Sequence, residues 1–283
     1  MQIYREMDIG TAKPTDAEKR GVPHHLFDIK NPDEPFSAQD FVTLANEAVA
    51  EILSRGRLPV FCGGTGLYLD AFLRGGMPET PGADPALRAE LAAFAEAHGA
   101  EALHGELLAV DPESAEQAHP NNLRRVIRAL EIHRLTGIPK SEWDRRSRAL
   151  PARFDAAVLG LMFADRALLY ERIERRVDMM LSDGLLEETR ALLCAGVFER
   201  SPTAAAAIGY KELLPYLRGE CSLEDAVTEL KTATRRYAKR QLTWFGAKDY
   251  VRPLTVDGEN GMLKSEQIVN NALALAECAW NML

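Results

Sequence analysis

The sequence has few cysteines, and their spacing argues against two kinds of site. Four occur in 283 residues, with no C-x-x-C pair, at Cys62, Cys194, Cys221 and Cys278. Such dispersed thiols indicate neither a disulfide framework nor a zinc cluster. Reduced cysteines in a cytoplasmic protein are therefore expected.

Long apolar runs are also absent. No stretch reaches the roughly 18 apolar residues that a membrane-spanning helix needs, so we expect no membrane association. The first residues lack an apolar segment after a basic start, and we therefore predict no signal peptide.

There is no overall excess of positive charge. Lysine and arginine total 34 against 42 acidic residues, for a net charge of −8, which argues against a uniformly basic nucleic-acid-binding surface. Two segments run against this balance: residues 121–148 carry +5 and residues 231–248 carry +6. They indicate either a confined site for a polyanion or two solvated helix faces.

The phosphate-binding pattern G-x-x-x-x-G-K-[ST] occurs nowhere in the chain. A different glycine turn, Gly63-Gly64-Thr65-Gly66, lies between residues 58–62, which we predict to be a buried strand, and a helix from Leu67. Such a turn lets a ligand approach the backbone closely, and the helix N-terminus favours anions. It can equally be structural.

The remaining pattern predicts an α/β fold with a parallel sheet. Residues 38–55 have helical apolar spacing, a capping box at Ser37 and Asp40, and a stop at Gly56. Residues 87–148 are helical almost throughout, with predicted breaks at Gly99, Pro112, Pro120, Gly137 and Pro139, which indicates an all-helical insertion. A strand at 156–163 then resumes the sheet. Later, Ser222 and Asp225 form a second capping box, which opens a helix to about Phe245.

Two arginines, Arg172 and Arg176, stand one turn apart on a predicted amphipathic helix. Side chains at this spacing share a face and can clamp a diphosphate. The alternative is a surface pair bridged to Glu171 or Glu174.

Other polar and aromatic residues have simpler interpretations. His24 and His25 lack a third ligand at suitable spacing, so a structural role is predicted. Asp8 and Asp28 lie near turns and are expected to cap them. Trp244 is expected in the core.

Eight motifs, in order along residues 1 to about 245, resemble those of the tRNA dimethylallyltransferase family, which is similar in fold to P-loop kinases. They are MDIGTAKPT (7–15), HHLFDI (24–29), FSAQDF (36–41), GGTGLYL (63–69), HPNNLRRVIRALE (119–131), GIPKS (137–141), AIGYKEL (207–213) and TRRYAKRQLTWF (234–245).

The resemblance implies a fold and a reaction. The fold is a P-loop NTPase-like parallel sheet core, in residues 1–81 and 150–283, with a helical tRNA-binding insertion at 82–149. In the reaction, the N6 amine of the adenosine 3′-adjacent to the anticodon attacks dimethylallyl diphosphate, and N6-isopentenyladenosine forms. The resemblance also implies Mg²⁺, a tRNA anticodon stem-loop as partner, and a monomer.

The resemblance also assigns residues. Arg176 and Thr65 are expected to be catalytic, and Arg172, Arg176, Lys13 and Thr11 to bind diphosphate. The expected tRNA contacts are Met1, Gln2, Thr65, Arg88, Arg124, Arg125, Val126, Ile127, Arg128, Ala206, Ala207, Ile208, Gly209, Tyr210 and Lys211.

The chain departs from the family pattern at two places. Family members have a first strand, a P-loop and a helix, followed by a general-base aspartate, before the motif with which this chain starts, and Gly246 stands where arginine is usual. We therefore expect this chain to be nearly inactive, with exposed apolar surface and poor solubility where the first strands would pair. The alternative functions are a non-catalytic RNA-binding remnant and an adenylate isopentenyltransferase.

Overall fold

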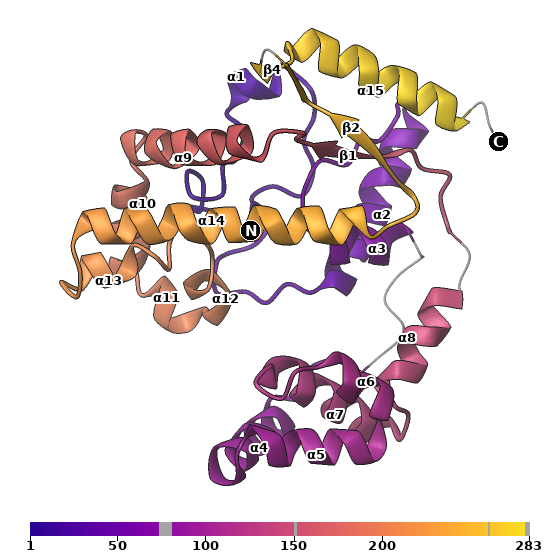
Figure 1. The fold of residues 1–283 in the computed structure, drawn as a ribbon, viewed down its shortest axis with the longest axis vertical. Coiled ribbons are helices and arrows are strands. Elements are labelled where there is room, and N and C mark those ends of the chain that lie inside the picture. Colours follow the sequence, from indigo (N-terminus) through magenta and orange to yellow (C-terminus); the bar gives the residue numbers. More distant parts are fainter. Residues whose placement is uncertain (74–80, 150–151, 260, 281–283) are drawn as a thin grey trace. The chain divides into compact units, whose positions relative to one another are not determined.

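The computed structural model describes residues 1–73, 81–149, 152–259 and 261–280. The chain forms two compact units, one made of Met1–Gly66 with Ala156–Leu283, the other of Leu67–Asp155 (Figure 1). We call the second the helical unit and the first the sheet unit. The boundaries fall at 66/67 and 155/156, whereas the sequence predicted 81/82 and 149/150. Residues 74–80, which lie between the predicted and the observed first boundary, are outside the described residues.

The sheet unit contains a small parallel sheet. β1 (Val158–Met162) pairs with β2 (Val251–Thr255) in the register Val158↔Val251 to Met162↔Thr255. Both strands contact α14 (Leu223–Gly246) and α15 (Ser265–Trp280), and Figure 1 shows them between these two helices. The α/β class with a parallel sheet is thus confirmed. β1 was predicted, but β2 was missed, because Pro253 breaks its strand pattern.

The strand predicted at residues 58–62 does not form. These residues are irregular, and Leu58, Val60 and Phe61 are 64%, 75% and 41% exposed. Backbone groups in a strand must pair with a neighbouring strand, and the described residues offer none here. The expected exposed apolar surface is therefore present, but a P-loop NTPase-like sheet of several strands is not seen in the described residues.

Helices build most of the sheet unit. α1 (Asp16–Lys19) is short, and α2 (Ala38–Ser54) begins at the predicted capping box of Ser37 and Asp40. Next come α9 (Arg166–Ser182), α10 (Leu185–Cys194), α11 (Val197–Arg200), α12 (Pro202–Ala205) and α13 (Leu214–Leu217). Their core includes Met7, Val177, Leu185, Tyr210 and Leu213, which brings the N-terminal loop onto these helices. A short hairpin, β3 (Asp257–Gly258) with β4 (Gly261–Met262), follows β2.

The helical unit has its own core. It comprises α3 (Gly66–Leu73, from its second residue), α4 (Pro85–His98), α5 (Ala100–Val110), α6 (Pro112–Gln117), α7 (Leu123–Thr136) and α8 (Lys140–Ala149). The predicted breaks at Gly99, Pro112 and Gly137 are confirmed. The apolar cluster is formed by Leu91, Leu103, Leu107, Val126 and Leu130, among others. Of the helices in the described residues, none combines the length and apolar character needed to cross a bilayer.

Candidate functional site

Arg172 and Arg176, the two arginines of α9 (Arg166–Ser182) that could clamp a diphosphate, are exposed and carry no acidic partner in the described chain. Glu171 pairs instead with Arg175 at 2.5 Å, and Glu174 pairs with Arg235 of α14. Within the described chain, neither Arg172 nor Arg176 makes an ion pair or a side-chain hydrogen bond. The surface-pair alternative is therefore not realised, and both guanidiniums keep their donors available for an anion.

A loop at residues 7–13 is held by one carboxylate, that of Glu188 on α10. Its oxygens accept hydrogen bonds from the backbone N–H groups of Asp8, Ile9 and Gly10, at 3.0, 2.8 and 3.1 Å. The Tyr210 hydroxyl donates to the same carboxylate at 2.6 Å. Burial and the adjacent Glu188 charge raise the pKa of Tyr210 well above its usual value, so the phenol remains a donor.

The segment 206–211 packs directly against this loop. A methyl group at Gly10 would lie 2.5 Å from the Tyr210 ring, so only glycine allows the approach. Gly209 adopts φ of +104°, and its amide donates to Glu212 at 2.9 Å. Tyr210, Ala207 and Gly209 are buried and serve packing, and the expected tRNA contact of this segment stays a prediction. Ala206 and Lys211 are exposed, and Ile208 is half-buried.

Lys13 is engaged by two carboxylates. Its Nζ lies 2.6 Å from Asp8 and 2.5 Å from Asp28, and the side chain is 7% exposed. The same group donates to the Tyr4 carbonyl. Asp8 and Asp28 are thus ion-pair partners instead of turn caps. The expected diphosphate contact of Lys13 would require these pairs to open.

Thr11 and Gln2 also stabilise the loop. The Thr11 hydroxyl donates to the Met7 carbonyl at 2.6 Å, and the Gln2 amide donates to the carbonyls of Thr11 and Ala12. Their polar groups are directed to the backbone, while Met1 is 42% exposed.

The glycine turn 63–66 lies against α14. The Gln241 amide donates to the Gly64 carbonyl at 3.1 Å, and a methyl group at Gly66 would lie 2.0 Å from the indole nitrogen of Trp244. Trp244 is 38% exposed, so its expected place in the core is corrected: it covers the turn. Thr65 is exposed and its hydroxyl makes no hydrogen bond within the described chain.

In the helical unit, Glu131 ties together two of the arginines expected to contact tRNA. This fully buried carboxylate accepts two hydrogen bonds from Arg88, at 2.8 and 2.9 Å, and one from Arg128 at 2.5 Å. Burial alone would raise the pKa of Glu131, but the hydrogen bonds from both arginines outweigh it and lower the pKa. Sequence reasoning missed Glu131, whose position inside an apolar helix face gave no signal of its partners.

The start of α7 separates exposed from buried residues. Arg124 and Arg125 are exposed and have no partner in the described chain. Val126 is fully buried and Ile127 packs beside it, so these two side chains belong to the core, and the tRNA contact expected of their segment stays a prediction.

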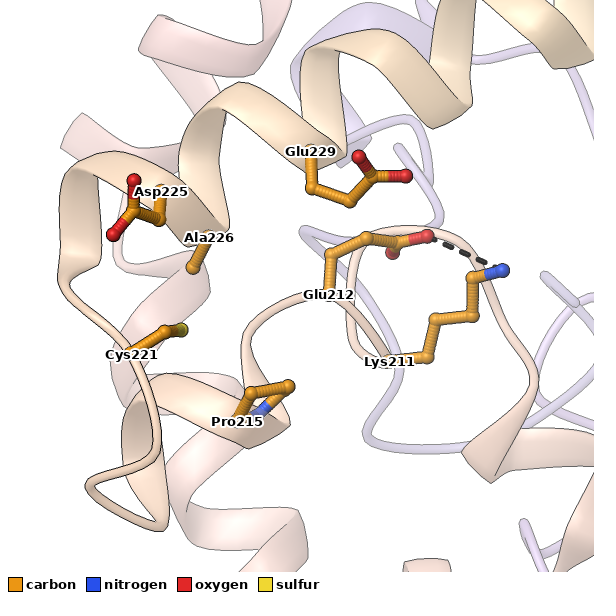
Figure 2. A pocket seen from close by; sticks show the side chains of 7 residues that line it. All are labelled: Lys211, Glu212, Pro215, Cys221, Asp225, Ala226 and Glu229. Carbon is orange, nitrogen blue, oxygen red and sulfur yellow. Dashed lines mark ion pairs between the residues drawn. The ribbon is translucent and has the colours of Figure 1, made fainter.

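A cavity of about 420 Å³ lies beside Lys211 and the start of α14 (Figure 2). Its charged lining is Lys211, Glu212, Asp225 and Glu229, and Lys211 pairs with Glu212 at 3.4 Å. Burial raises the pKa of Glu212. Since carboxylates outnumber the single lysine, this cavity does not suit a diphosphate.

The expected structural role of the histidine pair is confirmed for His24, whose ring nitrogen Nδ1 lies 2.8 Å from the Val22 carbonyl. Within the part of the chain that the structure describes, no three His, Cys, Asp or Glu side chains come together as a metal site.

Comparison with known proteins identifies the family. The sequence profile described as IPP transferase matches residues 2–248. The chain belongs to the IPP transferase family. It is 52% identical over 246 residues to the tRNA dimethylallyltransferase of Geobacillus thermodenitrificans, covering 87% of this chain and 76% of the relative. The Bacillus pumilus tRNA dimethylallyltransferase is 50% identical, with 88% and 77% covered.

Solved IPP transferases have a similar fold. The full-length tRNA isopentenylpyrophosphate transferase from Bacillus halodurans matches with a TM-score of 0.67 and 43% identity, over 99% of this chain and 87% of that one. A eukaryotic dimethylallyltransferase acting on tRNA matches with a TM-score of 0.72 and 30% identity, over 90% and 65%.

Proposed function

We propose that this IPP transferase moves a dimethylallyl group from dimethylallyl diphosphate to N6 of the adenosine 3′-adjacent to the anticodon of a tRNA. The product is N6-isopentenyladenosine. Family membership supports prenyl transfer, and the observation that carries the proposal is the pair of guanidiniums of Arg172 and Arg176 on α9, which have no partner among the described residues.

These arginines suit the leaving group. As the amine nitrogen bonds to the allylic carbon, the C–O bond breaks and its electrons pass to the diphosphate, while the amine loses a proton to a base. Two guanidiniums one turn apart can hydrogen-bond the diphosphate oxygens and stabilise the charge that develops there. Thr65, exposed on the glycine turn, would contact the RNA and assist catalysis.

Arg124 and Arg125 suit the RNA backbone. Both are exposed in the first turn of α7, where the helix N-terminus also favours phosphate. Contacts of this kind position an RNA without reading its sequence. Arg88 and Arg128 would support them from the Glu131 cluster, and a free nucleotide would need none of these contacts.

We further propose that Mg²⁺ enters with the diphosphate, because Mg²⁺ commonly takes substrate phosphate oxygens as ligands. We also propose that the protein is a monomer and that it acts on tRNA in the cytoplasm.

The test is an assay of the 283-residue chain with anticodon stem-loop RNA and dimethylallyl diphosphate, read by mass spectrometry of the digested nucleosides. We expect slow formation of N6-isopentenyladenosine, since no G-x-x-x-x-G-K-[ST] motif is present. Arg176→Ala should lower the rate about 100-fold or more. Arg175→Ala is the matched control, because Arg175 pairs with Glu171, and it should change the rate little.

Two outcomes would contradict the proposal. RNA binding without any product, even at high enzyme concentration, would favour the non-catalytic RNA-binding alternative. Faster prenylation of adenosine monophosphate than of the stem-loop RNA would favour the adenylate isopentenyltransferase.

A further inference from the structure

α9 and α14 are joined by a ladder of ion pairs. Asp178 pairs with Lys231 at 2.6 Å, and four residues along each helix Glu174 pairs with Arg235. The residue numbers fall on α9 as they rise on α14, so the helices run antiparallel. Acids on α9 therefore face bases on α14 at successive turns.

At the next two positions of this ladder, α9 no longer carries a carboxylate. Continuing by four residues on each helix leads to Tyr170 with Lys239, and then to Arg166 with Thr243. At these steps α9 offers a phenol and a cation where it offered carboxylates before. Arg166 and Lys239 therefore lie at this end of the α9–α14 contact without an acidic partner in the described residues.

These four residues surround a cavity. Arg166, Tyr170, Lys239 and Thr243 line a space of about 90 Å³ together with Leu169 and Leu242. Within the described residues, Arg166, Lys239 and the Tyr170 hydroxyl have no hydrogen-bond or ion-pair partner, whereas the Thr243 hydroxyl donates to the Lys239 carbonyl at 3.0 Å.

We propose that this cavity binds one phosphate group. A phosphate oxygen would take the place of the missing carboxylates, accepting charge-assisted hydrogen bonds from Arg166 and Lys239 and one from the Tyr170 hydroxyl. Leu169 and Leu242 exclude water from one side, which strengthens these interactions. The small volume suits a single phosphate and not a nucleotide.

The site is separate from the proposed diphosphate clamp. Six residues separate Arg166 from Arg172 and Tyr170 from Arg176, which places each pair about 120° apart around α9. The phosphate could come from an RNA backbone or from free phosphate or diphosphate, since the cavity recognises the group that they share. The inference does not rest on the proposed function, because phosphate binding can be measured without catalysis.

The experiment is calorimetric titration of inorganic phosphate at low salt into the 283-residue chain carrying Arg172→Ala and Arg176→Ala, which removes the other arginine pair. Arg166→Glu is the decisive further change, because a carboxylate here completes the ladder beside Lys239. We expect phosphate affinity to fall at least about tenfold while the melting temperature is kept or rises. Lys239→Gln should weaken phosphate binding as well.

Arg190→Glu is the matched control, since it makes the same charge change at an exposed arginine of α10 that has no partner in the described part of the chain. Phosphate binding that survives Arg190→Glu but not Arg166→Glu supports the site. Absence of binding before Arg166 is changed, or equal loss in both variants, would overturn it. With Arg172 and Arg176 intact, weaker stem-loop RNA binding by Arg166→Glu would identify an RNA phosphate as the occupant. Unchanged RNA affinity together with lost phosphate binding would identify a free anion.

Discussion

Glu188 shows how much one side chain can organise. Its carboxylate binds three consecutive backbone amides about 180 residues earlier in the chain and the hydroxyl of Tyr210. Loops otherwise satisfy their amides with water or local turns, so this loop depends on a distant residue. Thr11 and Lys13, both expected to meet the diphosphate, lie on the same loop. Their positions therefore depend on α10.

We predict that Glu188→Gln destabilises the protein by about 1.5–3 kcal/mol, because an amide replaces a charged acceptor with one acceptor oxygen. Hydrogen exchange of the amides at residues 8–10 should become faster than in the wild type. Glu187→Gln is the control, as Glu187 is exposed and makes no hydrogen bond in the described chain. Equal protection of the loop in both variants would contradict the role assigned to Glu188.

Elements meet closely where the glycine turn touches α14. Gly64 and Gly66 have no room for a side chain, since Gln241 and Trp244 occupy that space. Gly63 in the same turn is different, because a methyl group added there would meet nothing within 4 Å. The turn therefore has a packing function even if Thr65 contacts a substrate.

Gly66→Ala should displace the Trp244 ring, because the added methyl would lie 2.0 Å from the indole nitrogen. We expect a red-shifted tryptophan emission and a loss of about 1–3 kcal/mol in stability. Gly63→Ala, with open space around it, should leave the spectrum unchanged. If Gly66→Ala behaves like Gly63→Ala, the close packing of the turn on α14 is wrong.

At the scale of the whole molecule, charge is divided unevenly. Residues 121–148 and 231–248 carry +5 and +6, so the rest of the chain carries −19 and the total is −8. Both basic segments contain paired and unpaired side chains. On α14, Lys231 and Arg235 are paired, whereas Lys239 has no partner in the described chain. On α7, Arg128 and Arg134 are paired, whereas Arg124 and Arg125 have no partner there. Much of the basic charge thus stabilises the fold.

The helical unit should be sensitive to acid. Hydrogen bonds lower the pKa of Glu131 and, despite burial, that of Asp111, to which Ser114 and Ser141 donate. Between these lowered pKa values and the unfolded values of about 4, the folded unit therefore binds fewer protons than the unfolded chain. Stability is therefore complete above the unfolded pKa values and is lost as the pH falls through the folded ones.

Fluorescence of Trp143 can follow this unit alone once Trp244 and Trp280 are changed to phenylalanine, since Trp143 is its one tryptophan. We expect the denaturant midpoint to decrease as the pH is lowered from about 5 to about 3, the range in which carboxyl groups become protonated. Glu131→Gln should cost about 3 kcal/mol at neutral pH and flatten this dependence, because it leaves Arg88 and Arg128 with a neutral partner. The same slope in both proteins would show that Glu131 is not the responsible group.

Local sequence alone determined several features of this protein. The capping box at Ser37 and Asp40, the helix breaks at Gly99 and Gly137, and the spacing of Arg172 and Arg176 all involve residues within four positions of each other or single residues with restricted backbones. Such interactions form wherever the segment lies. Together with the ordered motifs, they were sufficient for the α/β class, the helical insertion and the family.

The tertiary structure alone decided which strands pair and which charges stay free. Residues 58–62 have a strand pattern as clear as that of β1, but a strand exists only with a neighbour. The sequence did not reveal that Glu131 lies beside Arg88, or that Asp8 and Asp28 lie beside Lys13. The partner of a charge, like the partner of a strand, is chosen by proximity in space, which spacing along the chain does not reveal.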